Sequence, residues 1–187
     1  MVKDEGKQFE NPPPGLWPAF MLGWFDIGTQ PGYEGKPTHQ VVGLWELIVL
    51  DEAGNEVRMT KGEYAGKRFL MSKTYTYSLN EAANLSIDLC NWRGRAFDAA
   101  EREEGFDLDV TKGRPCVLNI TAYVKRDGKP GVKIATVNPA IRGGPAWHQE
   151  TPANYVPAWI QKKMTEGSAA LVQQGQGMPP EDEGIPF

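Results

Sequence analysis

A mainly β fold with one internal helix is predicted by two features of this 187-residue sequence. Apolar and polar residues alternate in several short stretches, which are separated by clusters of Gly, Pro, Asn and Asp. In the middle of the chain, apolar residues instead recur at helical spacing. The hydrophobic share of 40% is enough for one core, so we expect one domain with appendages.

Three strands are expected before the helix. The first lies within Leu16–Gly28, where aromatic and aliphatic residues are dense, and a loop rich in Gly and Pro follows it. The second is Val41–Leu50, which is dense in β-forming residues. Phe69–Leu79 is the third, because its apolar residues alternate with Ser and Thr.

The helix is predicted over Asn80–Trp92, where apolar residues recur every three or four positions. Ser78 or Asn80 is the expected N-cap, because short polar side chains accept hydrogen bonds from the first turn. Gly94 is expected to end the helix, since glycine adopts the left-handed conformation easily.

Two further strands, Cys116–Lys125 and Val132–Val137, are joined by the turn-forming sequence Arg126–Gly131. Five strands with a helix between the third and the fourth is the order of the OB-fold. That fold is a small Greek-key barrel that binds oligonucleotides on one strand face and in two loops. We therefore predict a five-stranded OB-type barrel, with an SH3-like or other small barrel as the alternative.

Composition divides the chain into four parts. Residues 1–15 are charged and then Pro-rich, so an irregular arm is expected before a barrel over 16–144. Residues 145–166 hold aromatic residues in polar surroundings and include a short amphipathic helix near Val156–Thr165. From 167 to 187 Gly, Ser, Gln and Pro predominate, which predicts a disordered tail.

Several classes of protein are disfavoured. Two cysteines and two histidines are too few for a disulfide framework, a zinc site or a nucleophilic triad. The carboxylates lack metal-ligand spacing, so we expect no enzyme activity, no metal and no cofactor. Nothing resembles a signal peptide and no apolar run approaches membrane-spanning length, so a cytoplasmic protein without membrane contact is expected.

The net charge of −4 is unusual for a nucleic-acid binder, but the charges are unevenly distributed. Residues 58–73 hold five basic side chains and one acidic one, and residues 112–133 hold six and one. Acidic residues gather in 98–109 and 181–183 instead. The basic stretches are either a nucleic-acid surface or ordinary solvated faces, and the acidic segment 98–109 has no assigned role.

The chain ends in Glu181-Asp182-Glu183-Gly184-Ile185-Pro186-Phe187. This tip resembles that of bacterial single-stranded-DNA-binding proteins, in which an acidic run precedes Ile-Pro-Phe. A terminal aromatic residue with its own carboxylate can enter an apolar pocket with a basic rim, and the acidic residues steer it there. The resemblance implies that Glu181, Asp182, Glu183, Ile185, Pro186 and Phe187 bind replication or recombination proteins.

Short segments between residues 16 and 144 also resemble phage-encoded single-stranded-DNA-binding proteins, and they follow the same order along the chain. They are Asp26–Gln30, Ser72–Leu79, Asn91–Phe97, Gly113–Ile120 and Lys125–Lys129. This second resemblance implies an OB-type barrel that binds single strands.

Binding of single strands without sequence preference requires cations for the phosphates and aromatic faces for the bases. The cations expected near the binding face are Lys36, Lys67, Arg68, Lys73, Lys125, Arg126, Lys129 and Lys133. Tyr123, on the polar side of its strand, and Tyr33, in the first loop, are the leading stacking candidates. Trp24, Trp45 and Tyr75 are further candidates.

Some assignments have two readings. Lys73 shares the parity of apolar residues, so it lies either where the face opens or with its stem along apolar surface. Arg93 and Arg95 contact either phosphate or the acidic segment. Core positions are favoured for Tyr77, Trp92, Phe97 and Phe106.

The sequence thus predicts a protein that coats single-stranded DNA during phage replication or recombination and recruits proteins through its tip. The alternative is an OB-fold adaptor whose main ligand is a replisome protein. The sequence leaves the oligomeric state open, a homo-oligomer included.

Overall fold

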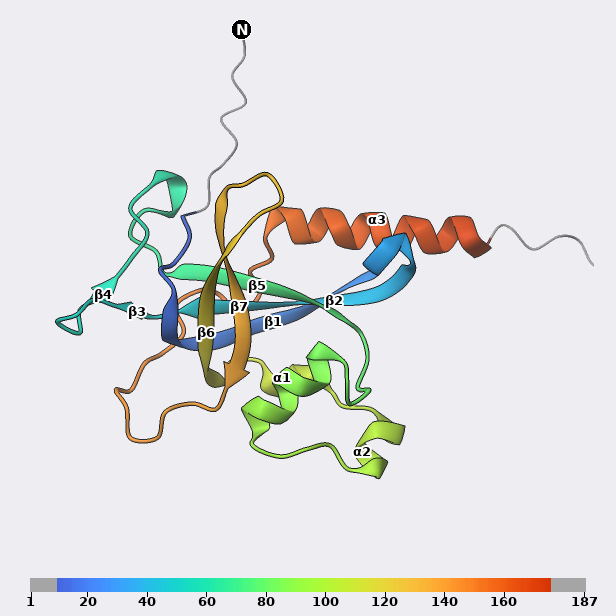
Figure 1. Ribbon diagram of the computed structural model, residues 1–187, viewed down its shortest axis with the longest axis horizontal. Helices are drawn as coiled ribbons and strands as arrows, with labels where there is room; N and C mark the ends of the chain where they lie inside the picture. Colours follow the sequence, from blue (N-terminus) through green and yellow to red (C-terminus); the bar gives the residue numbers. More distant parts are fainter. Residues whose placement is uncertain (1–9, 176–187) are drawn as a thin grey trace, which may run out of the picture.

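The computed structural model describes the backbone of residues 10–175, and the side chains up to Gly167 except that of Tyr33. Five strands form one antiparallel sheet in the order β5-β2-β1-β6-β7 (Figure 1). These strands are β1 (Gly15–Pro31), β2 (Pro37–Leu47), β5 (Phe69–Thr76), β6 (Pro115–Val124) and β7 (Pro130–Asn138). The predicted mainly β class is therefore confirmed.

The smaller elements connect these strands. A two-stranded sheet of β3 (Val49–Leu50) and β4 (Glu56–Val57) follows β2. The helices α1 (Asn84–Arg93) and α2 (Ala99–Glu104) follow β5, and α3 (Ala158–Gly175) follows β7. Short 3-10 helices occupy Tyr33–Gly35, Gly62–Tyr64 and Leu108–Thr111. No helix within residues 10–175 combines the length and apolar character that a membrane crossing requires.

The long strand β1 joins the two halves of the sheet. It pairs with β6 through Gly15–Phe20 and with β2 from Ala19 to Pro31. A bulge between Met21 and Gly23 shifts the side-chain alternation. Met21 and Trp24 therefore both face the core, although they are an odd number of residues apart.

The sheet is open between its edge strands, because β5 and β7 form no ladder within the described residues. Side chains occupy this gap instead: Lys73 Nζ on β5 donates to Asp88 Oδ2 on α1 (2.6 Å) and to the Ala135 carbonyl on β7 (3.3 Å). Asp88 Oδ1 accepts from the Val137 amide at 3.4 Å. The predicted closure into a barrel is thus replaced by side-chain bridges from α1.

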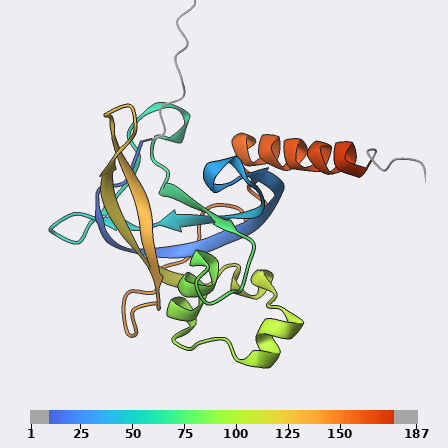
Figure 2. The ribbon, with the colours of Figure 1, turned by 45° about the vertical axis from the view of Figure 1, so that its right-hand side comes forward.

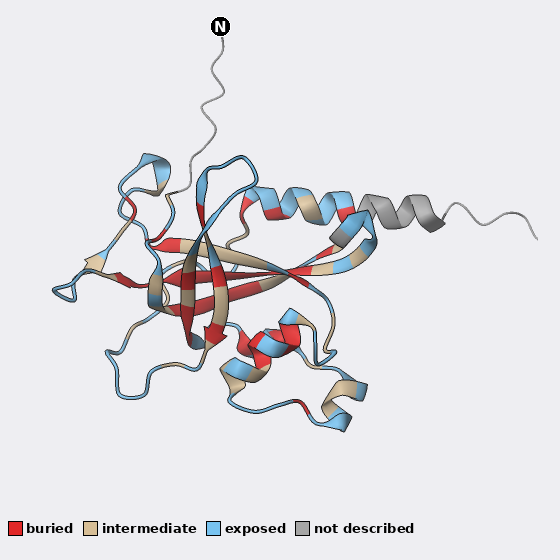
Figure 3. Cartoon of the chain, in the orientation of Figure 1, coloured by how far each residue is buried: buried red, intermediate tan, exposed pale blue. Residues whose placement is uncertain are grey.

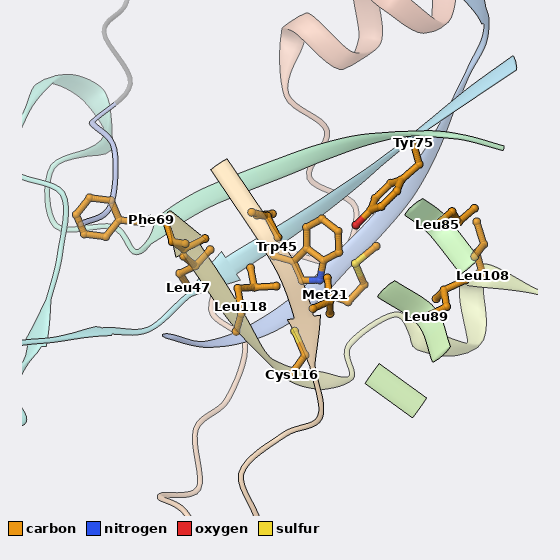
Figure 4. Close-up of a cluster of buried hydrophobic side chains, with 14 of the residues drawn as sticks. Met21, Trp45, Leu47, Phe69, Tyr75, Leu85, Leu89, Leu108, Cys116 and Leu118 are labelled. Atoms are coloured by element: carbon orange, nitrogen blue, oxygen red, sulfur yellow. The ribbon is translucent and has the colours of Figure 1, made fainter. Parts of the chain in front are cut away.

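The main core lies between the curved sheet and α1. Trp45 lies beside Met21 and Leu118, and α1 adds Leu85 and Leu89 (Figures 3 and 4). The opposite face of β1 and β2 is also covered, because α3 packs on it on the side away from α1 (Figure 2).

Under α3 a second cluster forms from Ile27, Val42 and Ile160. Gly167 approaches β1 so closely that a Cβ there would lie 2.0 Å from the Ile27 carbonyl oxygen. Glycine at this position therefore lets α3 lie directly against the strand.

Three local predictions need correction. The N-cap of α1 is Ala83 without a side-chain cap, because Ser78 and Asn80 instead accept hydrogen bonds from amides of the preceding turn. The second predicted strand is interrupted at Ile48, whose amide donates to the Pro18 carbonyl at 2.8 Å. Finally, α3 continues to Gly175 rather than ending near 166, because Ala, Leu and Gln after Gly167 favour a helix.

Candidate nucleic-acid interface

The β6–β7 hairpin carries an exposed group of basic and aromatic residues. Tyr123 is 39% exposed, and Lys133 Nζ lies 5.8 Å from the centre of its ring. Lys125, Arg126 and Lys129 are exposed at the tip, where the Lys125 amide donates to the Lys129 carbonyl at 2.8 Å. The structure therefore brings together five residues that the sequence predicts as DNA contacts, and we call them the hairpin surface.

Side-chain alternation and a glycine shape the hairpin surface. Tyr123, Lys125 and Lys133 share one face, and Gly131 on β7 pairs directly with Tyr123. A Cβ at Gly131 would lie 2.9 Å from the Tyr123 ring and 3.0 Å from Lys125 Cε. The missing side chain therefore lets the tyrosine and the lysine stem lie across the hairpin. Asp127 adds one acid, 3.7 Å from Lys129 Nζ.

Two further predicted cations are exposed but lie apart from the hairpin surface. Lys36 is in the β1–β2 connection, where its Nζ is 3.9 Å from Glu34 Oε2. Lys67 lies before β5 with its Nζ 5.5 Å from the centre of the Tyr64 ring. Tyr33 begins the 3-10 helix of the β1–β2 connection, and its side chain lies outside the described part of the structure.

The other predicted stacking residues are part of the core, which corrects their assignment. Trp45 is fully buried, and Trp24 packs edge-on against it while its Nε1 donates to Thr111 Oγ1 at 2.8 Å. Tyr75 is buried, and its hydroxyl donates to Asp88 at 2.8 Å. Burial and the nearby Asp88 carboxylate raise the pKa of Tyr75. Lys73 contacts the same carboxylate, so all four residues hold the fold together.

Arg68 is likewise not a DNA contact, because it is only 4% exposed and sits in a buried ion cluster. Its guanidinium donates to Glu46 (2.9 Å), to Glu56 (2.7 Å) and to the His148 carbonyl (2.6 Å). Glu46 also accepts from the backbone amides of Glu150 (2.9 Å) and Thr151 (2.6 Å). This cluster fastens the segment after β7 to the sheet.

Hydrogen bonds keep the Glu46 carboxylate charged although it is buried. Burial alone would raise the pKa of Glu46, but hydrogen bonds from Thr151, the Glu150 amide and Arg68 outweigh it, so the pKa is lowered. Arg58 extends the cluster through a paired contact with Glu150 at 2.7 and 2.8 Å. With Lys73 bound to Asp88, three cations of the basic stretch 58–73 are therefore paired with acids within the protein.

The acidic segment 98–109 has a structural role. Asp98 and Glu101 form a reciprocal capping box at the start of α2, and Asp107 caps the following 3-10 helix. Glu101 also pairs with Arg93 and Arg95. Of the two readings for these arginines, the pairing with the acidic segment is the one observed.

We expect the Glu101 pairing to contribute to stability above the ordinary carboxylate range. The hydrogen bond from Arg95 lowers the pKa of Glu101 from 4.5 to about 2. Because the folded-state pKa is depressed, this contribution is lost as pH falls from 4.5 towards 2. Urea unfolding of Glu101→Gln should show lower stability than wild type at neutral pH and convergence at low pH. A constant difference across that range would contradict the assignment.

Two pockets next to the sheet contain aromatic residues that the sequence analysis did not assign to DNA. The first, of about 260 Å³, is lined by Tyr64, Tyr155 and Trp159 above Leu44 and Met71, and we call it the aromatic groove. Tyr64 and Tyr155 also line the adjoining pocket with Lys67. The signal for this site is the run of aromatic residues in polar surroundings after residue 145.

The remaining sequence predictions concern Tyr77, the C-terminal tip and metal ligands. Tyr77 is 50% exposed against His39 rather than in the core, with ring centres 5.0 Å apart. The tip residues Glu181, Asp182, Glu183, Ile185, Pro186 and Phe187 lie outside the described residues. Among the residues that are described, no three His, Cys, Asp or Glu side chains gather as a metal site.

No protein-family model, no curated protein and no solved structure matches this chain.

Proposed function

We propose that the protein binds single-stranded DNA without catalysis and with little sequence preference. The hairpin surface carries this proposal, because it combines four exposed cations with the exposed ring of Tyr123. Cations bind phosphates whatever the sequence, and every base has a face that can stack on an aromatic ring. The hairpin surface therefore has both components that single-strand binding requires.

The strand order supports the same proposal. The first three strands of this sheet along the chain, β1, β2 and β5, form one half of it, and the last two, β6 and β7, form the other half. Side chains of α1 bridge the two edge strands. We propose that this is an OB-type barrel in which side chains of β5 and α1 take the place of the last ladder. In OB-folds the loop between the last two strands is one of the ligand-binding loops, and here that loop is the basic hairpin tip.

The biological setting follows from the two sequence resemblances. We propose that the protein coats single strands during phage replication or recombination in the host cytoplasm. In this proposal the tip, residues 181–187, recruits replication proteins while the folded part stays on DNA.

A salt series tests the proposal. Fluorescence anisotropy of labelled oligo-dT should show an affinity that falls linearly on a log–log plot against salt. Four phosphate contacts predict a slope of about −3, from roughly −0.7 per contact on single strands. Affinity that does not change with salt would exclude phosphate binding by the hairpin surface.

Deletion of Glu181–Phe187 should leave oligo-dT affinity unchanged or raise it, because three carboxylates are removed from a chain of net charge −4. Capture of replication proteins from infected-cell extract should be lost. A matched deletion of residues 174–180 keeps the tip and serves as the control. Collapse of oligo-dT affinity on tip deletion would contradict the separate roles of tip and hairpin.

A protein adaptor is the second candidate, and one observation favours it. An apolar pocket of about 300 Å³ lies at the end of the sheet away from the hairpin tip, lined by Phe20, Ile48, Val117, Ile141 and Trp147 among others. Such a pocket suits an apolar side chain of a protein partner. Weak oligo-dT binding even at low salt would favour this candidate.

A further inference from the structure

We infer that the aromatic groove is a second DNA contact, a pocket for a single nucleotide base formed by Tyr64, Tyr155 and Trp159. The inference rests on the proposed function, and it assigns base stacking to the segment after β7 in addition to the hairpin. Its volume of about 260 Å³ lies just below the roughly 300–1,000 Å³ typical of pockets for drug-sized ligands. A single base is the appropriate size of ligand.

The lining suits a base. Leu44 and Met71 provide apolar surface from β2 and β5, and the three aromatic rings come from two other segments. Ser72 and Asn11 add polar groups that can hydrogen bond to a base edge. Glu10 is also present, but its carboxylate accepts from the Thr60 amide at 2.6 Å and is thereby held by the protein.

Trp159 is held in place by its helix. It is 36% exposed, whereas its neighbour Ile160 is fully buried against Ile27 and Val42. Packing of Ile160 fixes the rotation of α3, so the indole of Trp159 keeps its place in the lining of the groove. An aromatic ring that is held in place loses little conformational freedom when a base stacks on it.

The groove is lined by one charged residue, Glu10, and the cation Lys67 belongs to the adjoining pocket. Tyr64 stays neutral, since burial and a hydrogen bond with Tyr155 raise its pKa to about 12. Lys67 lies over the Tyr64 ring with its Nζ 5.5 Å from the centre, where it can meet a phosphate. Val132 of the groove precedes Lys133 of the hairpin surface in the edge strand β7. Their side chains point to opposite faces of the strand, so the two sites lie on either side of this edge.

Substitution of Trp159 tests the inference. Trp159→Leu keeps apolar packing but removes the stacking face, so the Kd for labelled oligo-dT should rise by about tenfold. The slope of affinity against salt should not change, because no phosphate contact is lost. Trp159→Phe should bind within about threefold of wild type. Trp147→Leu, in the apolar pocket, is the matched control and should leave the Kd unchanged.

Two readouts separate stacking from folding and from the proposed function. Thermal unfolding should show equal midpoints for wild type, Trp159→Leu and Trp159→Phe. Oligo-dT should quench the tryptophan emission of Trp159→Phe less than that of wild type. If wild type binds oligo-dT and Trp159→Leu binds it with the same Kd, the inference is overturned and the proposed function stands. Wild type that does not bind oligo-dT would overturn both.

Discussion

Replacement of Glu46 by Ala should destabilise the protein by about 3–5 kcal/mol, the cost of breaking a buried ion pair by removing one partner. Arg68 would remain buried without this partner, and the amides of Glu150 and Thr151 would lose their acceptor. This is a large share of the roughly 5–15 kcal/mol that stabilises a typical domain. Urea unfolding followed by circular dichroism measures the loss.

Two further variants show whether a loss of stability in Glu46→Ala comes from the buried ion pair. Glu46→Gln keeps the shape and a hydrogen-bond acceptor but not the charge, so its loss of stability should be smaller. Glu52→Ala changes an exposed acidic residue in the turn after β3, and should alter stability by no more than about 0.5 kcal/mol. A loss below about 1 kcal/mol in Glu46→Ala would mean that the ion cluster does not hold the segment after β7.

Removal of the hairpin charges should produce the largest loss of DNA binding. A variant with Lys125, Arg126, Lys129 and Lys133 all replaced by Gln should bind oligo-dT at least a hundredfold more weakly at low salt. The salt slope should shrink by about 3, because four phosphate contacts disappear at roughly 0.7 each. Anisotropy titrations at several salt concentrations give both quantities.

A matched pair of double variants localises that effect. Arg126→Gln with Lys129→Gln removes two exposed cations from the hairpin tip. Lys112→Gln with Arg142→Gln removes two exposed cations from the opposite end of β6 and β7. The first pair should weaken binding and the second should not. Equal losses from both would indicate a diffuse response to net charge in place of a hairpin site.

Alternation of side chains was sufficient to predict most strands, since β5 and β6 each begin within a residue of the predicted position. It did not show which aromatic residues are exposed. Trp24 and Met21 face the same side only because of the bulge between them, and a bulge has no clear signal in one sequence. Because α3 covers the outer face of β1 and β2, these strands carry buried apolar residues on both faces. Alternation therefore did not show which face of these strands is turned to the main core.

The charged residues were harder to predict because their partners are remote in sequence. Arg68 pairs with Glu46 and contacts the segment at His148, eighty residues away. A basic stretch therefore looked like a DNA surface although two of its arginines are neutralised by acids. The hairpin surface could be predicted because local alternation along β6 and β7 decides which face carries Tyr123, Lys125 and Lys133.

The preference for single strands tests the central claim most directly. Labelled oligo-dT and a duplex of the same length are titrated with the full chain by anisotropy, in one buffer at moderate salt. We predict clearly tighter binding to the single strand, because a duplex hides the base faces that Tyr123 would stack on. Equal affinity for the duplex and the single strand would contradict single-strand binding.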